Sequence, residues 1–321
     1  MSKWMCLFMM LPALSFSQSY APAAGQPGST AISKDSNVLI GWATGVVVER
    51  GPLDIADISL GNASHGTAQD ALGPAEGDGV LVVSLGDRGS ATLTFSSPIM
   101  NGPGPDFAVF ENGFADNYME FAFVEVSSDG QNFVRFPSFS ETPLTSQIDN
   151  FMFGDCRYVH NLAGKYRQGF GTPFDLDELN PGIPIDLNAI THVRLVDVVG
   201  SIDPLYGSTD VLGNLINDPY PTVFESGGFD LDAVGVIHQA PLGIPDIADK
   251  IAIYPNPANS FVTVSFPGKC DLEAFSSDGK LLKAIPDFEG GKCSLEDLSG
   301  TIFIRLVNDN ISTVQKIMVM E

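Results

Sequence analysis

The chain has 321 residues, of which 44% are hydrophobic and only 17% charged. This length suggests two domains, and the apolar fraction excludes an intrinsically disordered chain. Sixteen basic residues oppose 39 acidic ones, and the net charge of −23 argues against nucleic-acid and anionic-membrane partners, since both are bound through Lys and Arg. The surplus of carboxylates is compatible with bound hard cations such as calcium, and also with solubility alone.

The first residues have the pattern of a secretory signal peptide. Lys3 precedes an apolar run over 4–14, and small residues lead to a cleavage point after Ser17. The run is shorter than the roughly 20 apolar residues that a membrane-spanning helix needs, and no second such run follows. We therefore expect a signal peptide at 1–17, a flexible leader at 18–37 and an exported mature chain without a transmembrane segment.

Residues 38–240 are predicted to form an all-β domain, because strand-like runs alternate with Gly, Pro, Asn and Asp and no helical periodicity is sustained. The Asp129-Gly130 pair between two apolar runs predicts a hairpin, since glycine tolerates a positive φ. Short strands at turn-separated intervals favour a jelly-roll-like β-sandwich over a parallel sheet. The expected strands are 80–85, 91–95, 106–110, 121–126, 133–136, 192–198 and 231–237.

A Pro/Gly-rich linker at 241–247 separates this domain from a second unit, 248–321, which is predicted to be a small antiparallel β-sandwich of about seven strands. The motifs of this unit are, in chain order, Tyr254-Pro255-Asn256-Pro257-Ala258-Asn259, Ser277-Asp278-Gly279-Lys280, Leu295 to Gly300 before Ile302-Phe303-Ile304-Arg305, and Gln315-Lys316-Ile317.

These motifs resemble the type A sorting domain of the type IX secretion system of Bacteroidetes-type bacteria. The unit departs from that family at Thr301-Ile302-Phe303 and in its two cysteines. The resemblance implies an Ig-like fold, recognition by the type IX secretion machinery, and a final location outside the cell or on the outer-membrane surface, reached through the periplasm.

Three cysteines remain after the signal peptide: Cys156, Cys270 and Cys293. In an exported protein this odd number allows at most one internal disulfide and leaves one thiol. Cys270 and Cys293 could pair within the C-terminal unit, or could be two separate core residues. The sequence leaves both alternatives open, because it does not give the distance between their Cα atoms.

The large domain contains candidate ligands for a calcium ion. Asp230 and Asp232 stand two residues apart on a predicted strand, so their side chains share a face and would repel unless something neutralises them. Calcium takes six to eight oxygen ligands from carboxylates, amides and carbonyls, and Asp106, Glu111 and Asn112 bracket another predicted strand. We expect these five residues to supply ligands, with Asp230 foremost. The alternative is that Asp230 caps the preceding glycine loop and Asp232 accepts backbone N–H groups.

Two segments of this domain resemble known modules. The hairpin at 124–130 is similar to that of galactose-binding-like, discoidin-type jelly rolls. The strand at 229–234 resembles the last strand of secreted jelly-roll and concanavalin-like modules, in which a carboxylate often meets a structural calcium. The whole span 40–238 resembles a family of bacterial surface proteins of uncharacterised activity that carry the motif found here at 106–113.

Aromatic residues gather in two long predicted loops, 137–190 and 199–228, among them Tyr166, Phe170 and Tyr206. Aromatic faces at one end of a sandwich can stack on sugar rings, so these three residues are our candidate glycan site. The alternative is that the rings fold back onto the core.

The sequence contains no nucleophile motif, P-loop or dinucleotide fingerprint, and its histidines lack metal-binding spacing. The pattern therefore favours a non-catalytic secreted or cell-surface protein that binds glycans or another surface ligand, with loops stabilised by calcium. The alternatives are a structural or adhesive surface protein without a small ligand, and a hydrolase of unassigned type.

Overall fold

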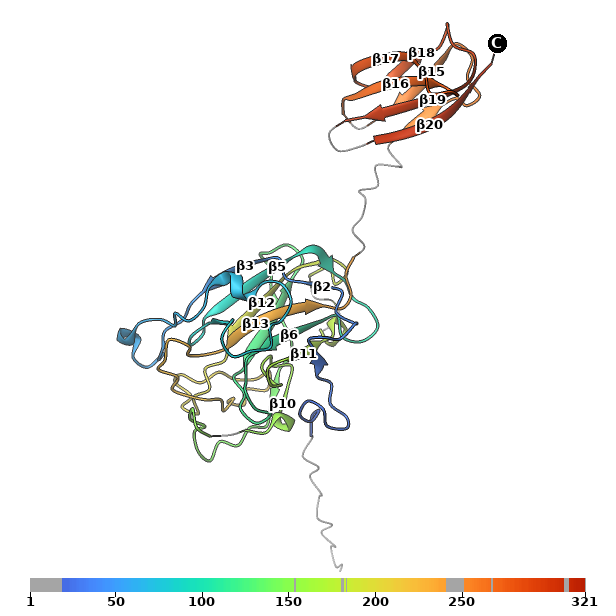
Figure 1. Cartoon of the computed structure of the whole chain (residues 1–321). Helices are drawn as coiled ribbons and strands as arrows, with labels where there is room; N and C mark the ends of the chain where they lie inside the picture. The colour runs from blue at the N-terminus through green and yellow to red at the C-terminus, as the bar shows by residue number, and fades with distance from the viewer. Residues whose placement is uncertain are drawn as a thin grey trace, which may run out of the picture. The chain divides into compact units, whose positions relative to one another are not determined.

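A computed structural model describes residues 19–152, 154–179, 182, 184–240, 251–266, 268–308 and 312–320. The chain divides into two compact units, 1–241 and 242–321 (Figure 1). The expected signal peptide at 1–17 and the expected linker at 241–247 lie outside the described residues.

The large unit contains two main antiparallel sheets. The first has the strand order β1-β11-β6-β13-β2, with β4 also paired to β13, and the second has the order β3-β5-β12-β7-β8. The strands of the first sheet are β1 (Ile32–Ser33), β2 (Gly41–Trp42), β4 (Val83–Ser84), β6 (Phe107–Glu111), β11 (Phe170–Phe174) and β13 (Asp230–Val236). Those of the second are β3 (Gly45–Glu49), β5 (Ser90–Ile99), β7 (Ala122–Ser127), β8 (Val134–Arg135) and β12 (Ile190–Asp197).

The connectivity of these strands is that of a jelly roll. Along the chain, β5, β6 and β7 alternate between the two sheets, and so do β11, β12 and β13. The inner faces of both sheets contribute to one core, in which the rings of Phe107, Phe136 and Phe174 lie 5.1–5.9 Å apart between centroids. The predicted all-β, jelly-roll-like sandwich is confirmed.

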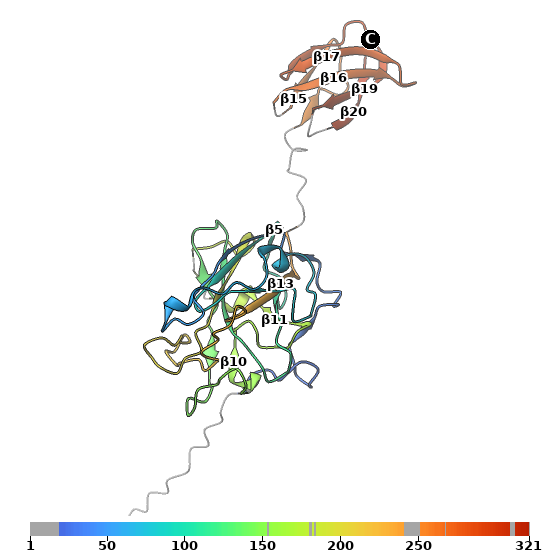
Figure 2. The same ribbon diagram turned by 60° about the vertical axis from the view of Figure 1, so that its left-hand side comes forward.

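Much of the large unit is irregular, and the segments around β10 (Val159–His160) are mainly loops (Figures 1 and 2). The strand β10 pairs with β9 (Phe139–Ser140). Short 3₁₀ helices interrupt the loops: η1 (Ile58–Leu60), η2 (Ala68–Ala71), η3 (Cys156–Tyr158) and η4 (Leu176–Glu178).

The segment expected to be a flexible leader is instead packed against the domain from residue 19 onward. Its strand β1 pairs with the first two residues of β11. The amide of Tyr20 donates to the carbonyl of Arg157 at 3.1 Å. The hydroxyls of Thr30 and Tyr166 are hydrogen-bonded at 2.8 Å. The small and polar residues that suggested a flexible leader therefore cover an otherwise exposed sheet edge.

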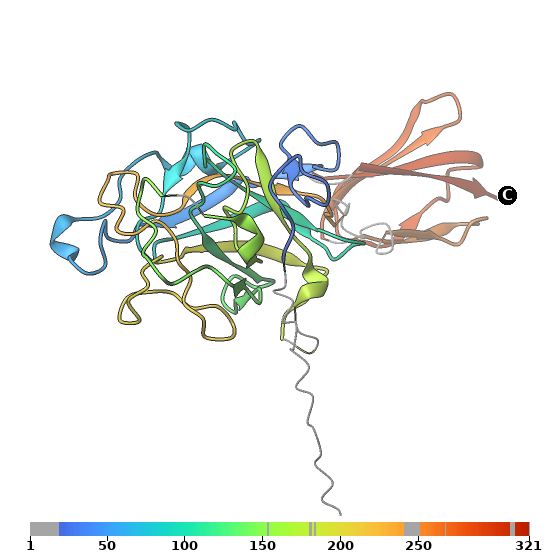
Figure 3. The ribbon, with the colours of Figure 1, turned by 90° about the horizontal axis from the view of Figure 1, so that it is seen from below.

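The C-terminal unit is a small β-sandwich whose strands form two facing layers (Figure 3). Its sheets have the orders β14-β15-β18 and β17-β16-β19-β20 and enclose a separate apolar core. The strands are β14 (Ala252–Tyr254), β15 (Phe261–Ser265), β16 (Cys270–Ser276), β17 (Leu281–Phe288), β18 (Gly291–Ser294), β19 (Gly300–Val307) and β20 (Ser312–Val319).

Both cysteines of the C-terminal unit are buried free thiols, Cys270 in one sheet and Cys293 in the other. They are two of the apolar core positions, which is the second of the alternatives that the sequence left open. Among the described residues, no helix is long and apolar enough to cross a membrane.

Candidate functional site

A solvent-open hollow of about 210 Å³ lies where β6 ends and where β7 and β13 begin. Four parts of the chain that are distant in sequence supply its walls: the segment between β6 and β7, the loop that leads into β13, the loop before β4, and the loop between β9 and η3. We call it the acidic hollow, and its lining residues are Gly79, Asn112, Phe114, Tyr118, Glu120, Asn150, Thr222, Phe224, Ser226 and Asp230.

Aromatic rings form part of the wall of the acidic hollow. Phe114 stacks on Tyr118 with 4.4 Å between ring centroids and 28° between ring planes. Phe114 is nevertheless 65% exposed and Phe224 is 53% exposed. Large aromatic side chains normally become buried on folding, so two exposed rings beside polar groups are typical of a binding surface.

Asp230 is held in the wall by hydrogen bonds from two neighbouring elements. It is the first residue of β13, where it pairs with Ser84 of β4, and the Ser84 hydroxyl donates to its Oδ1. The Asn112 side-chain amide donates to its Oδ2 at 2.9 Å. Burial raises the pKa of Asp230 to about 6, and the two hydrogen bonds act in the opposite direction.

Three further carboxylates surround this position and are buried. Glu111 ends β6, Glu120 lies two residues before β7, and Asp218 lies in the loop before β13. Burial raises the pKa of each well above its ordinary value, and the negative charges of the neighbouring carboxylates add to this for Glu111 and Glu120. Burial alone disfavours the charged form, and proximity of like charges disfavours it further.

The buried carboxylates lack a direct positive partner. Within the described part of the chain, no ion pair involves Glu111, Glu120, Asp218 or Asp230. The nearby guanidinium of Arg50 donates instead to the carbonyl oxygens of His65, Ser84 and Gly66.

The structure brings three of the five predicted calcium ligands together and places the other two elsewhere. Glu111, Asn112 and Asp230 come together at the acidic hollow, because β6 and β13 are neighbours and Glu111 pairs with Leu231. Asp232 accepts the backbone N–H groups of residues 76 and 77, both at 2.9 Å, which is the alternative weighed above.

Asp106 lies at the opposite end of β6 from Glu111. Its Oδ1 accepts from the amide of Gly102 at 2.7 Å and contacts His238 Nδ1 at 2.8 Å. Its Oδ2 accepts from the amide of Leu176 at 2.8 Å. Asp106 therefore joins the chain around one end of the jelly roll and is absent from the acidic hollow.

The three predicted glycan-stacking aromatics do not form one open surface. The Tyr166 side chain is only 2% exposed, so its ring cannot stack on a ligand. Phe170 in β11 is partly covered by the guanidinium of Arg167, 4.5 Å above its ring. Tyr206 lies in the loop before β13, where its carbonyl accepts from Arg88. For Tyr166, the alternative of a ring folded onto the core is the observed one.

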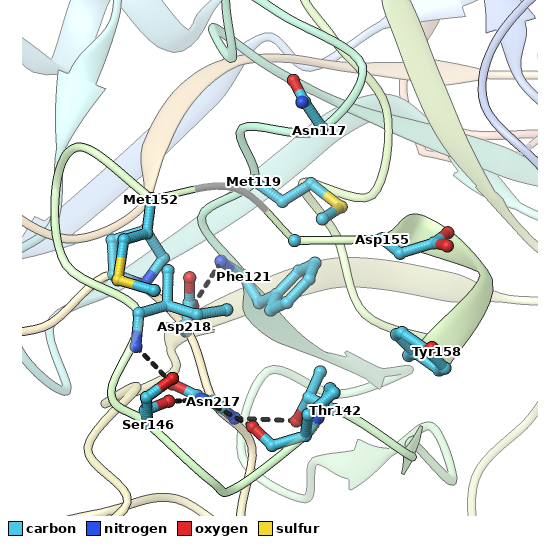
Figure 4. Close-up of a pocket in the computed structure, with 14 residues that line it drawn as sticks. Asn117, Met119, Phe121, Thr142, Ser146, Met152, Asp155, Tyr158, Asn217 and Asp218 are labelled. Carbon is cyan, nitrogen blue, oxygen red and sulfur yellow. Dashed lines mark hydrogen bonds between the residues drawn. The ribbon is translucent and has the colours of Figure 1, made fainter.

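A second hollow, of about 290 Å³, is lined in part by Asp218 and is mainly apolar (Figure 4). Met119, Phe121 and Met152 contribute to its wall, and Asp218 accepts the amide of Phe121 at 2.8 Å. The side chain of Asn217 holds the surrounding loop by donating to the carbonyls of residues 143 and 146. These contacts fix the loop that carries Asp218.

A buried lysine lies near β10, outside both hollows. Lys165 donates to the carbonyl of Val159 at 2.8 Å, and burial lowers its pKa from 10.5 to about 8. The folded state thus releases this proton before the unfolded state does, so the contribution of Lys165 to stability rises as pH increases from about 8 to 10.5.

We expect Lys165→Met to remove about 3 kcal/mol of this pH-dependent stabilisation between those limits, because one pKa unit corresponds to about 1.4 kcal/mol. The measurement is urea unfolding of both proteins at several pH values. The comparison is repeated in a Cys156→Ala background, since that buried thiol titrates nearby. Parallel pH profiles of the two proteins would contradict the prediction.

Comparison with known proteins assigns the C-terminal unit. Residues 252–320 match the family model described as "Secretion system C-terminal sorting domain". The C-terminal unit is a type IX secretion sorting domain. A sorting domain of this kind directs export to the cell surface or the extracellular space, so the protein is a secreted or surface protein that engages the type IX machinery.

Beyond the sorting domain, the comparisons are distant. A solved biofilm-associated protein BSP domain is 12% identical, with 73% of this chain and 48% of that one covered and a TM-score of 0.22. A Faecalibacterium prausnitzii β-glucuronidase is 10% identical, with 91% and 46% covered and a TM-score of 0.17. The chain thus spans about half the length of either neighbour. The curated proteins contain no match.

Sequence reasoning missed Glu120, Asp218, Phe114 and Phe224 as site residues. Glu120 carries one signal, because it is a single acid within the apolar run Met119-Glu120-Phe121 that enters a buried strand. The other three lie in irregular segments, where no periodicity indicates which way a side chain points.

Proposed function

We propose that residues 19–240 are a non-catalytic binding domain, carried out of the cell by the sorting domain, whose ligand is a glycan held in the acidic hollow. The observation that supports this most directly is the pair of exposed rings, Phe114 and Phe224, beside the carboxylates and amides of the same hollow.

The chemistry of the hollow is complementary to that of a sugar ring. A pyranose presents an apolar C–H face, which packs on aromatic rings, and a rim of hydroxyls, which donate to carboxylates and amide oxygens. Glu120 and Asn150 supply such acceptors, and Thr222 and Ser226 add hydroxyls. Calcium at the base of the hollow is the second part of the proposal and is argued separately below.

We expect Phe114→Ala to weaken binding to the best ligand on a glycan array by about tenfold or more, since loss of one stacked ring costs about 1.4 kcal/mol or more. The array is run with the full mature chain in calcium and in EDTA. The control is Phe151→Ala, because Phe151 is 85% exposed and does not line the hollow. Equal loss in both variants would contradict the proposal, and loss in Phe170→Ala alone would move the site to β11.

A hydrolase is the second candidate, because Glu120 and Asp230 both line the hollow and burial raises both pKa values. Glycoside hydrolysis uses two such carboxylates, one protonated as the acid and one ionised. Release of reducing ends from the glycans that bind on the array, abolished by Glu120→Gln, would favour this function over simple binding.

A further inference from the structure

Two of the buried carboxylates near Asp230 contain an oxygen atom that has no hydrogen-bond partner among the described residues. Glu111 is 1% exposed and its Oε1 has no hydrogen-bond partner, and Asp218 is 3% exposed with an equally unpartnered Oδ1. A buried acceptor without a partner destabilises the folded state, and more strongly when it is charged. Two such atoms in one cluster are acceptors that a bound cation could use.

The backbone at Gly113 approaches Glu111 and Tyr118 closely. A Cβ atom on Gly113 would lie 2.8 Å from Glu111 Oε2 and 2.9 Å from the carbonyl oxygen of Tyr118. A carboxylate oxygen and a carbonyl oxygen therefore lie on either side of this glycine, close to each other. Only glycine fits there, since the Cβ of any other residue would clash with both oxygens.

We propose that Glu111, Glu120, Asp218 and Asp230 form the acidic part of a calcium site at the base of the acidic hollow, completed by the Tyr118 carbonyl and the Asn112 side-chain oxygen. The site shares the hollow with the proposed glycan ligand, and its test is separate. It keeps Glu111, Asn112 and Asp230 of the set expected from sequence. Glu120 and Asp218 take the places of Asp232 and Asp106, whose oxygens are bound to N–H donors.

The donor set fits calcium better than a transition metal, because it consists of oxygen atoms alone. Within the part of the chain that the structure describes, no three His, Cys, Asp or Glu side chains form a ready metal site. Calcium binding therefore requires the carboxylates to shift toward the ion and needs carbonyl, amide and water oxygens to complete the six to eight ligands. Within the described residues, no hydrogen bond or ion pair holds the Glu120 carboxylate, which lines the acidic hollow.

The test uses the full mature chain, stripped with EDTA and titrated with calcium chloride. After residue 17, Trp42 is the only tryptophan, so its fluorescence reports unfolding of the large unit alone. At a hundredfold excess over Kd, we expect calcium to raise the melting temperature of this unit by several degrees. Sodium chloride at matched ionic strength must not reproduce the shift, since it would act only by screening the net charge.

Glu120→Gln should weaken calcium binding at least tenfold and remove most of the shift, while Asp232→Asn should retain it. Glu120→Gln removes a buried unpaired charge, so it is expected to fold. Phe114→Ala should also retain the calcium shift, which separates this proposal from the glycan proposal. Identical melting in calcium and EDTA would overturn the proposal, as would a shift that survives in Glu120→Gln and disappears in Asp232→Asn.

Discussion

Asp106→Ala is expected to lower the free energy of unfolding of the large unit by about 3–5 kcal/mol, because it leaves buried donors without an acceptor. The Asp106 side chain is fully buried and accepts from the amides of Gly102 and Leu176 and from His238. These three partners come from the segment before β6, from η4 and from the segment that follows β13. The measurement is urea unfolding followed by Trp42 fluorescence.

The control for this prediction is Asp35→Ala. Asp35 makes only a surface ion pair with Lys34, and its side chain is 80% exposed, so its removal should change stability by less than about 0.5 kcal/mol. The effect of Asp106→Ala should be equal in calcium and in EDTA. If the loss disappears in EDTA, Asp106 returns to the set of calcium ligands.

The regular part of the fold was predictable because its strands are apolar runs bounded by turn residues. The expected strands at 106–110, 121–126 and 231–237 each coincide with a strand within one residue at either end. Gly130 has the positive φ of 73° that the predicted hairpin requires.

The strand β11 was not predicted, because its sequence, Phe-Gly-Thr-Pro-Phe, contains a proline that normally argues against a strand. Pro173 pairs with Ala108 of β6 on one side only, since β1 reaches no further than Gly171 on the other. The proline therefore occupies an edge position, where its missing N–H leaves no partner unsatisfied. A tertiary arrangement of this kind cannot be seen in a local pattern.

The candidate site was predictable only where strands carry it. Glu111 and Asp230 are strand-end residues, and the preference of calcium for oxygen ligands placed them in one set before their adjacency was known. Period-two alternation also put Asp230 and Asp232 on one face, yet it could not reveal that Asp232 meets the amides of a loop more than 150 residues earlier. Contacts made by irregular loops depend on the whole fold, so the sequence did not indicate that Phe114 and Phe224 line the hollow.

Deletion of residues 248–321 is expected to abolish export of the protein while leaving the large unit folded. The two units have separate apolar cores, one built from both jelly-roll sheets and the other from β14 to β20. A unit with its own core folds without its neighbour, so the urea midpoint reported by Trp42 should match that of the full chain. The sorting domain spans 252–320, so the shortened protein lacks the segment that the secretion machinery recognises and should accumulate in the periplasm.

The reciprocal experiment tests whether the sorting domain is also sufficient. Residues 248–321 fused to an unrelated periplasmic protein should carry that protein to the cell surface or the medium. Ile304→Ala in the fusion is the matched control, because Ile304 is fully buried in the core of the sorting domain and its truncation should cost about 2–5 kcal/mol. Export should therefore fall in this variant if the machinery recognises the folded sandwich. Normal amounts of the shortened protein outside the cell would show that the export signal lies elsewhere, and an unfolded large unit would show that the two cores are not independent.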